Sequence, residues 1–137
     1  MKYKQIFNSG VTFQQFYDTA QDRYKNYANN AIRNYLNLER DLEKVSSITS
    51  KFNILAIGEN WCIDSIINIP GVHWLEKNNE NIKLKVIDTD SYSKFMPNEK
   101  VITPTFIIMN QEYQEIGKWV QYPKRIIDVV SQVHFSV

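Results

Sequence analysis

One stretch constrains the rest of the chain: a short apolar run that stops at Gly58 and is followed at once by Trp61 and Cys62. Residues 52–57 form a run of the kind found in a strand that is covered on both faces. From Cys62 onward the apolar residues recur at helical spacing as far as Pro70. The pattern predicts a strand, a tight junction and a helix, with a thiol at the junction.

That thiol belongs to the only cysteine in the chain, so the sequence excludes an intramolecular disulfide framework. At the amino end of a helix, free backbone N–H groups and the positive end of the helix dipole favour a thiolate. Cys62 is therefore the candidate nucleophile. Ser65 stands three residues later, where a dithiol protein would carry its second cysteine, and its hydroxyl is expected to lower the pKa of Cys62.

Length and charge indicate how many domains the chain forms and which kinds of partner it is expected to bind. A chain of 137 residues without an evident linker or repeat predicts a single domain over residues 1–137. A net charge of +1 favours neither nucleic acid nor a membrane surface as partner. No apolar run approaches the roughly 18 residues of a membrane helix, and residues 1–10 lack the apolar core of a signal peptide. We expect a cytoplasmic protein whose thiol stays reduced.

The first third of the chain predicts a helical extension over residues 12–50, preceded by an extended arm over residues 1–10. Thr12 followed by Gln15 is a capping-box pattern, and aromatic residues then recur at helical spacing as far as Tyr27. Asn29 and Asn30 are expected to break the helix. A second helical pattern follows, so that the extension is a helical pair.

Residues 51–137 predict an α/β core. Two strands joined by a helix imply a parallel pair, and two strands joined by a tight turn imply an antiparallel hairpin. A mixed sheet of about four strands, flanked by helices on both faces, follows from this order. The further elements are a strand at 82–88, a short helix within 89–99, strands at 105–109 and 113–120, and a closing helix from Pro123 with Ile126, Ile127, Val130 and Val133 inward.

Over residues 51–135 the chain resembles the thioredoxin family. Trp61 precedes Cys62, and C-x-x-S occupies the slot of the family's C-x-x-C. Pro70 falls where the family's active-site helix carries its kinking proline. Thr103-Pro104-Thr105 opens a strand before a hairpin, as the family's cis-proline segment does, and Gly117 fits a further family glycine. The extension and the sequence W-C-I-D-S are similar to a bacterial branch with the motif W-C-x-D-C.

The resemblance implies a thioredoxin-like three-layer fold with a cis Thr103–Pro104 bond. Such a bond places the backbone of Thr103 beside the sulfur of Cys62, where an extended client could pair with it by strand addition. Trp61, Thr103 and Pro104 are thus the candidate substrate-binding residues, with Trp61 as a flat lip. The alternatives are a trans proline at the start of an edge strand and a Trp61 packed partly in the core.

Two departures from the family pattern concern proton transfer. The family's buried acid lies six residues before the first cysteine, and that position is Ala56 here; its lysine partner aligns loosely with Leu84. The machinery that assists a second thiol is therefore missing, in agreement with Ser65. Asp64 and Glu59 are candidate modulators, because a nearby negative charge opposes thiolate formation. Asp64 is alternatively a proton acceptor or an ordinary first-turn acid.

We therefore expect a monothiol redox protein that forms mixed disulfides through Cys62 and needs an outside thiol for release. Its partners would be client protein thiols or disulfides and a low-molecular-weight thiol such as glutathione. The role is exchange or client capture; the alternative is a redox-silent binding module that uses the same groove.

No cofactor is implied. His73, His134 and Cys62 show no metal-ligand spacing. Ile63-Asp64, in place of the Gly-Phe of a C-G-F-S motif, and the lack of an evident glutathione-binding signature argue against a monothiol cluster carrier.

Overall fold

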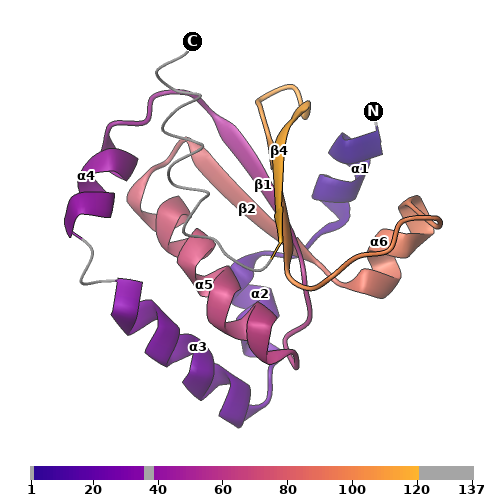
Figure 1. Cartoon of the computed structure of the whole chain (residues 1–137), viewed down its shortest axis with the longest axis horizontal. Helices are drawn as coiled ribbons and strands as arrows, with labels where there is room; N and C mark the ends of the chain where they lie inside the picture. The colour runs from indigo at the N-terminus through magenta and orange to yellow at the C-terminus, as the bar shows by residue number, and fades with distance from the viewer. Residues whose placement is uncertain (1, 36–38, 121–137) are drawn as a thin grey trace.

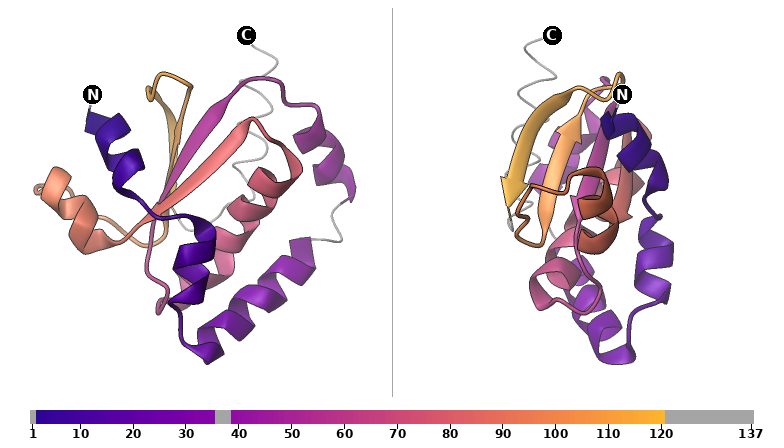
Figure 2. Two further views of the ribbon diagram at one scale, coloured as in Figure 1. Left: turned by 180° about the vertical axis from the view of Figure 1, so that it is seen from behind. Right: turned by 90° about the vertical axis from the view of Figure 1, so that its right-hand side faces the viewer.

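The computed structural model describes residues 2–35 and 39–120 (Figure 1). Helices lie on both faces of one sheet, as the two further views in Figure 2 show. In chain order the elements are α1 (Lys2–Ser9), α2 (Phe13–Asp18), α3 (Asp22–Tyr35), α4 (Glu39–Ser46), β1 (Phe52–Ile57), α5 (Ile63–Asn78), β2 (Ile82–Ile87), α6 (Thr89–Phe95), β3 (Thr105–Met109) and β4 (Glu115–Val120).

The sheet has the strand order β2-β1-β3-β4. β1 and β2 run parallel, in a register that pairs Phe52 with Ile82 and Ile57 with Ile87. β3 is antiparallel to both β1 and β4. The predicted mixed sheet, with a parallel pair and a closing hairpin, is thus confirmed.

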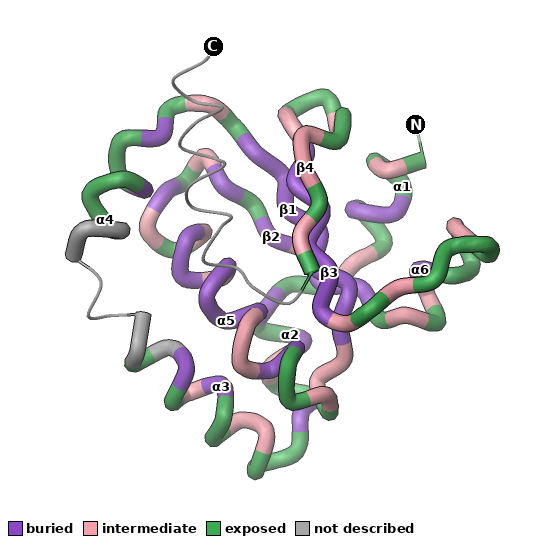
Figure 3. The backbone as a smooth tube through the Cα atoms, in the orientation of Figure 1, coloured by how far each residue is buried: buried purple, intermediate pink, exposed green. Residues whose placement is uncertain are grey.

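Alternation along β1 separates two apolar cores, because successive side chains of a strand point to opposite faces. Ile54 and Ala56 pack with α2–α5 on one face, whereas Leu55 and Ile57 pack with α1 and α6 on the other. The central strands β1 and β3 are buried along their whole length (Figure 3). Full burial of each large aliphatic side chain contributes roughly 1.5–3 kcal/mol, which explains why the apolar run at 52–57 forms a central strand.

The predicted extended arm over residues 1–10 is wrong, because Lys2–Ser9 forms helix α1. Ile6 and Phe7 are buried against the sheet, with Tyr3 partly buried on the same side. A helix this short is stabilised by its packed face rather than by local propensity. Beyond it, Val11 bridges Val86 through two backbone hydrogen bonds of 2.7 and 2.8 Å, along the outer edge of β2.

The predicted capping box is confirmed: Thr12 and Gln15 exchange hydrogen bonds at the start of α2. The predicted bounds of the helical pair are wrong, because the extension forms the three helices α2, α3 and α4. α2 ends at Asp18, and Asn29-Asn30 lie inside α3 instead of breaking it. The Asn29 side chain accepts a hydrogen bond of 3.0 Å from Tyr17, so a tertiary partner offsets the weak helix propensity of asparagine.

Helix α5 runs without interruption through Pro70 and Gly71, both of which are buried. It therefore extends eight residues beyond Pro70, the predicted limit of the helical pattern, and ends at Asn78. The predicted closing helix from Pro123, with its inward residues, lies outside the described residues. Among the described helices, none has the length and apolar character needed to cross a membrane.

Candidate functional site

Cys62 is the N-cap residue of α5 and has an extended backbone, with φ −95° and ψ 123°. Its N–H donates to the carbonyl oxygen of Glu59 at 3.2 Å, and its own carbonyl accepts from the N–H of Ile66 at 2.9 Å. Cys62 is half-buried. The thiol thus lies where the unpaired N–H groups of the first helical turn converge, as the sequence predicted.

A glycine is needed at the end of β1 because the chain passes closely beneath α5. A Cβ atom at Gly58 would lie 2.8 Å from Cδ1 of Ile69 and 2.9 Å from Oγ of Ser65. Residue 58 is therefore limited to glycine by space. This close approach sets the short connection that carries Cys62 from the strand to the helix.

Thr103, which lies two residues before the start of β3, contacts the thiol of Cys62. The Sγ atom of Cys62 lies 3.5 Å from Oγ1 of Thr103, and the Thr103–Pro104 peptide bond is cis. Thr105, the first residue of β3, pairs with Ile57, the last residue of β1. The antiparallel register therefore brings the residues before β3 beside those that follow β1.

The surroundings lower the pKa of the Cys62 thiol below its ordinary value. Burial acts against this by raising the pKa, and the hydrogen bond from the Thr103 hydroxyl is the largest effect that lowers it. The backbone and hydroxyl of Ser65 and the backbone of Asp64 contribute in the same direction. Hydrogen bonds to the sulfur stabilise the thiolate more than burial disfavours it.

Ser65 lies beneath Cys62 and is fully buried. Its Oγ accepts a hydrogen bond of 3.2 Å from the N–H of Glu59. Ser65 thus holds the turn before the helix, and its backbone and hydroxyl both lower the pKa of the Cys62 thiol.

The structure shows how the two proposed modulators, Asp64 and Glu59, meet the site. Asp64 affects the pKa through its backbone. The Oε1 atom of Glu59 accepts hydrogen bonds from the N–H and the hydroxyl of Thr89, at 2.8 and 2.7 Å. Glu59 therefore holds the start of α6 against the turn that precedes Cys62.

The position of the family's buried acid is apolar here. Ala56 is fully buried and has Val86 and Phe106 as its neighbours on the adjacent strands. Leu84 is also buried, and it is paired with Ile54. Aliphatic and aromatic side chains thus fill the space on this face of β1, and Ala56 supplies no proton acceptor.

Three exposed apolar residues directly adjoin Cys62 or Thr103 in the chain and form what we call the apolar rim: Trp61, Ile63 and Ile102, which are 63, 54 and 61% exposed. Trp61 is therefore not packed in the core. Ile63 and Ile102 were not among the predicted site residues, although each adjoins one of them in the sequence. A group of exposed apolar side chains beside a reactive atom is typical of a binding surface.

The segment that carries Thr103 is anchored through Glu99. The hydroxyl of the buried Tyr92 donates a hydrogen bond to Oε2 of Glu99, and Nζ of Lys118 in β4 lies 3.8 Å from Oε1 of the same carboxylate. Burial and the Glu99 carboxylate raise the pKa of Tyr92 well above its usual range. Tyr92 therefore stays protonated and acts as a donor.

Among the described residues there is no group of three or more His, Cys, Asp or Glu side chains that could hold a metal ion. His73 stacks on Phe13, with ring centroids 4.1 Å apart, and its Nδ1 lies 3.0 Å from Oε1 of Glu76. His134 lies outside the described residues.

A family model described as thioredoxin matches residues 10–134. The chain belongs to the thioredoxin-like family. Its family match begins within the turn before α2, so it includes the helical extension as well as the sheet. A search of curated proteins finds no match.

Solved structures share the thioredoxin-like fold of this chain. A protein of unknown function from Pseudomonas aeruginosa is 20% identical, with a TM-score of 0.78 over 98% of this chain and 85% of that one. An HIV epitope-scaffold is likewise 20% identical, with a TM-score of 0.78 over 92% of this chain and 81% of the scaffold. At this identity the similarity establishes the fold alone.

Proposed function

We propose that this thioredoxin-like protein is a monothiol redox protein that forms mixed disulfides through Cys62. The observation that carries the proposal is the position of the sulfur at the amino end of α5, 3.5 Å from the Thr103 hydroxyl, with a lowered pKa. A thiolate is the nucleophile in thiol–disulfide exchange, so these contacts supply the reactive form.

The chemistry is a single exchange. The Cys62 thiolate attacks one sulfur of a disulfide R–S–S–R′, forms the bond Cys62–S–S–R and expels R′–S⁻, which takes a proton from water. A second thiolate from outside then attacks the mixed disulfide, and Cys62 leaves as a thiolate. The disulfide is the oxidant and the outside thiol is the reductant, so each step balances.

Internal resolution does not occur because Ser65 takes the place of a second thiol. A hydroxyl is far less acidic than a thiol and is a weak nucleophile at neutral pH. Its oxygen already accepts the N–H of Glu59, and Ala56 offers no base to remove its proton. The mixed disulfide therefore persists until an outside thiol arrives, such as a client thiol or a low-molecular-weight thiol.

The apolar rim is the surface on which a client would rest. Trp61, Ile63 and Ile102 are exposed around the thiol, and Thr103 lies outside the paired strands. The backbone of Thr103 would pair with an extended client segment, as in strand addition. We expect clients with an apolar residue next to the reacting sulfur.

The same rim favours a second candidate, a redox-silent protein-binding module that uses the apolar rim without the thiol. Burial of the rim by a partner stabilises a complex whether or not a thiol is present. The two candidates differ in the effect of Cys62→Ser: client retention is lost if Cys62 forms the bond and is unchanged if the rim alone binds.

The test is the intact mass of the protein after incubation with oxidised glutathione or with a disulfide-linked client peptide. We expect one adduct, stable until a thiol is added, and no adduct with Cys62→Ser, which leaves the chain without cysteine. Absence of any adduct, together with client binding that is unchanged in Cys62→Ser, would show that the protein is a redox-silent binding module.

A further inference from the structure

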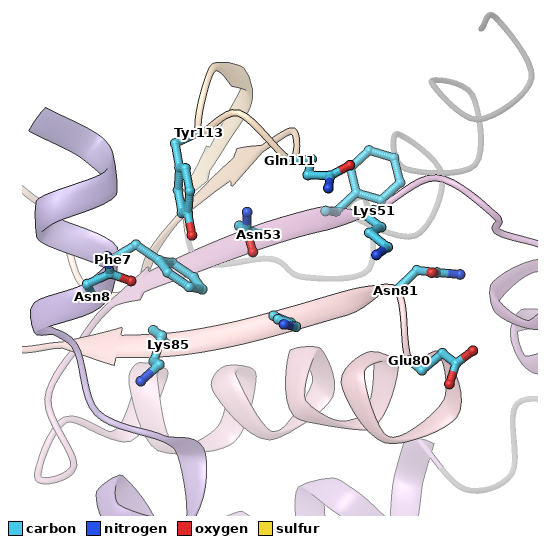
Figure 4. A pocket seen from close by; sticks show the side chains of 11 residues that line it. Phe7, Asn8, Lys51, Asn53, Glu80, Asn81, Lys85, Gln111 and Tyr113 are labelled. Atoms are coloured by element: carbon cyan, nitrogen blue, oxygen red, sulfur yellow. The ribbon is translucent and has the colours of Figure 1, made fainter. Parts of the chain in front are cut away.

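A hollow of about 790 Å³ lies on the sheet face that α1 and α6 only partly cover (Figure 4). It is found at the amino ends of β1 and β2, whereas Cys62 follows the carboxyl end of β1. We call it the sheet-face hollow. Its lining residues are Phe7, Asn8, Lys51, Phe52, Asn53, Glu80, Asn81, Lys83, Lys85, Gln111 and Tyr113.

The register of the parallel strands gathers lysines on this face. Lys83 lies opposite Asn53, and Lys85 lies opposite Leu55. Because side chains alternate between faces, Lys51, Asn53, Lys83 and Lys85 share one side of the sheet. Neighbouring strands are about 4.8 Å apart, and same-face residues along a strand about 6.6 Å apart. By these spacings the Cα atoms of Lys83 and Lys85 lie about 6.6 Å apart and those of Lys51 and Lys83 about 8 Å apart, whereas Lys51 and Lys85 lie about 14 Å apart. The three lysines thus form a row along the hollow with Lys83 in the middle.

The positive charge of this area is not balanced by the described residues. Glu80 is the single acidic side chain in the lining, against three lysines. The ion pairs found among the described residues join His73 to Glu76 and Lys118 to Glu99, and none involves a lysine of the hollow. Like charges that share one face of a sheet repel one another, so an anion bound between them would relieve this repulsion.

The ring of Tyr113 forms one wall of the hollow, and the backbone of this residue has an unusual conformation. Tyr113 has φ 62° and is the one non-glycine residue with positive φ among the described residues. This left-handed conformation is disfavoured for a residue other than glycine. It places the Tyr113 ring against Phe7, with centroids 5.7 Å apart, and over the hollow near Asn53 (Figure 4).

We propose that the sheet-face hollow binds a phosphorylated small molecule through Lys51, Lys83 and Lys85. Its volume is in the range of roughly 300–1,000 Å³ that is typical of small-molecule sites. Phosphate groups offer several charged oxygens to lysine ammonium groups, which bind them as point charges. The amides of Asn8 and Gln111 add neutral donors at the margin. The site is separate from Cys62 and does not rest on the redox proposal.

The test measures the binding of inorganic pyrophosphate and of ADP to the full chain, by thermal shift and by calorimetry at low ionic strength. Sodium chloride of matched ionic strength serves as the salt control, because general screening acts on all surface charges. We expect both probes to raise Tm by more than sodium chloride does. The double variant Lys83→Gln, Lys85→Gln should bind at least about tenfold more weakly.

Lys94→Gln is the matched control, since Lys94 is exposed on α6 and does not line the hollow. It should bind both probes as the wild type does. Without ligand, the double variant should have a Tm no lower than the wild type, because a repulsion has been removed. That result shows that its loss of binding is not a loss of folding.

Two results support the proposal. Equal Tm shifts with pyrophosphate and ADP would assign binding to the diphosphate group. A larger Tm shift with ADP, which Tyr113→Gly reduces to the shift seen with pyrophosphate, would assign additional binding to the Tyr113 ring. Two results overturn it: no shift larger than that with matched sodium chloride, or binding that the double lysine variant retains in full.

Discussion

The sulfur of Cys62 and the hydroxyl of Thr103 lie 3.5 Å apart, although 41 residues separate them in the chain. Pairing of β1 with β3 brings them together, since Ile57, the last residue of β1, is the register partner of Thr105, the first residue of β3. The reactivity of the thiol is thus a property of the sheet as well as of the helix that Cys62 begins.

Replacement of Thr103 by valine removes the strongest hydrogen bond to the sulfur and should raise the pKa of Cys62. We expect alkylation at pH 7 to slow by about threefold, a value reduced for the partial exposure of the thiol. Thr103→Ser keeps a hydroxyl and should restore most of the rate. If both variants react as the wild type does, the hydroxyl does not stabilise the thiolate.

Ser65→Cys should restore the missing half of the exchange cycle. Residue 65 already contacts both Cys62 and the turn before it, so a second thiol there should form an intramolecular disulfide on oxidation. Thiol counting before and after oxidation measures this. Reductase activity should be measurable but weak, because Ala56 provides no buried acid. Complete absence of the disulfide would show that the geometry of the first turn differs from that described.

Tyr92→Phe should destabilise the protein and loosen the segment that carries Thr103. The hydroxyl of Tyr92 is the buried donor to Glu99, and loss of a hydrogen bond to a charged group costs about 1.5–3 kcal/mol. Chemical denaturation measures the loss. Tyr3→Phe is the matched control, because its bond of 2.9 Å to Glu115 is exposed, and its effect should be smaller. Equal effects would contradict the anchoring role of Glu99.

Gly58→Ala should destabilise the fold by about 1–3 kcal/mol, as is usual for overpacking. The added Cβ would meet Ile69 and Ser65 at 2.8 and 2.9 Å. Since Ser65 is displaced, Cys62 should also react more slowly at pH 7. Chemical denaturation measures the loss of stability, and the alkylation rate of the same variant at pH 7 measures the change in Cys62 reactivity. Wild-type stability would show that the turn after β1 relaxes freely.

Local patterns predicted the central part of the fold. The apolar run at 52–57, the capping box at Thr12 and the hairpin after Pro104 each have a short-range cause: burial on two faces, reciprocal hydrogen bonds and a tight turn. These causes act within a few residues, so they are visible in the sequence.

The wrong predictions have tertiary causes. Helix α1 forms because Ile6 and Phe7 reach the sheet, and Asn29 remains helical because Tyr17 supplies a partner. Neither partner can be identified from local spacing. The same holds for the site: Cys62 and Ser65 follow from the motif, whereas Ile102 joins the apolar rim only through strand pairing.

The central claim is that Cys62 is a nucleophilic thiol, and the rate of its alkylation as a function of pH tests this most directly. Because the pKa is lowered in the folded protein, the rate should reach half its maximum at a pH below the free-cysteine value of about 8.5. The urea-unfolded chain, measured in parallel, should titrate near that value. A folded midpoint at or above the unfolded one, with no mixed disulfide formed, would contradict the account.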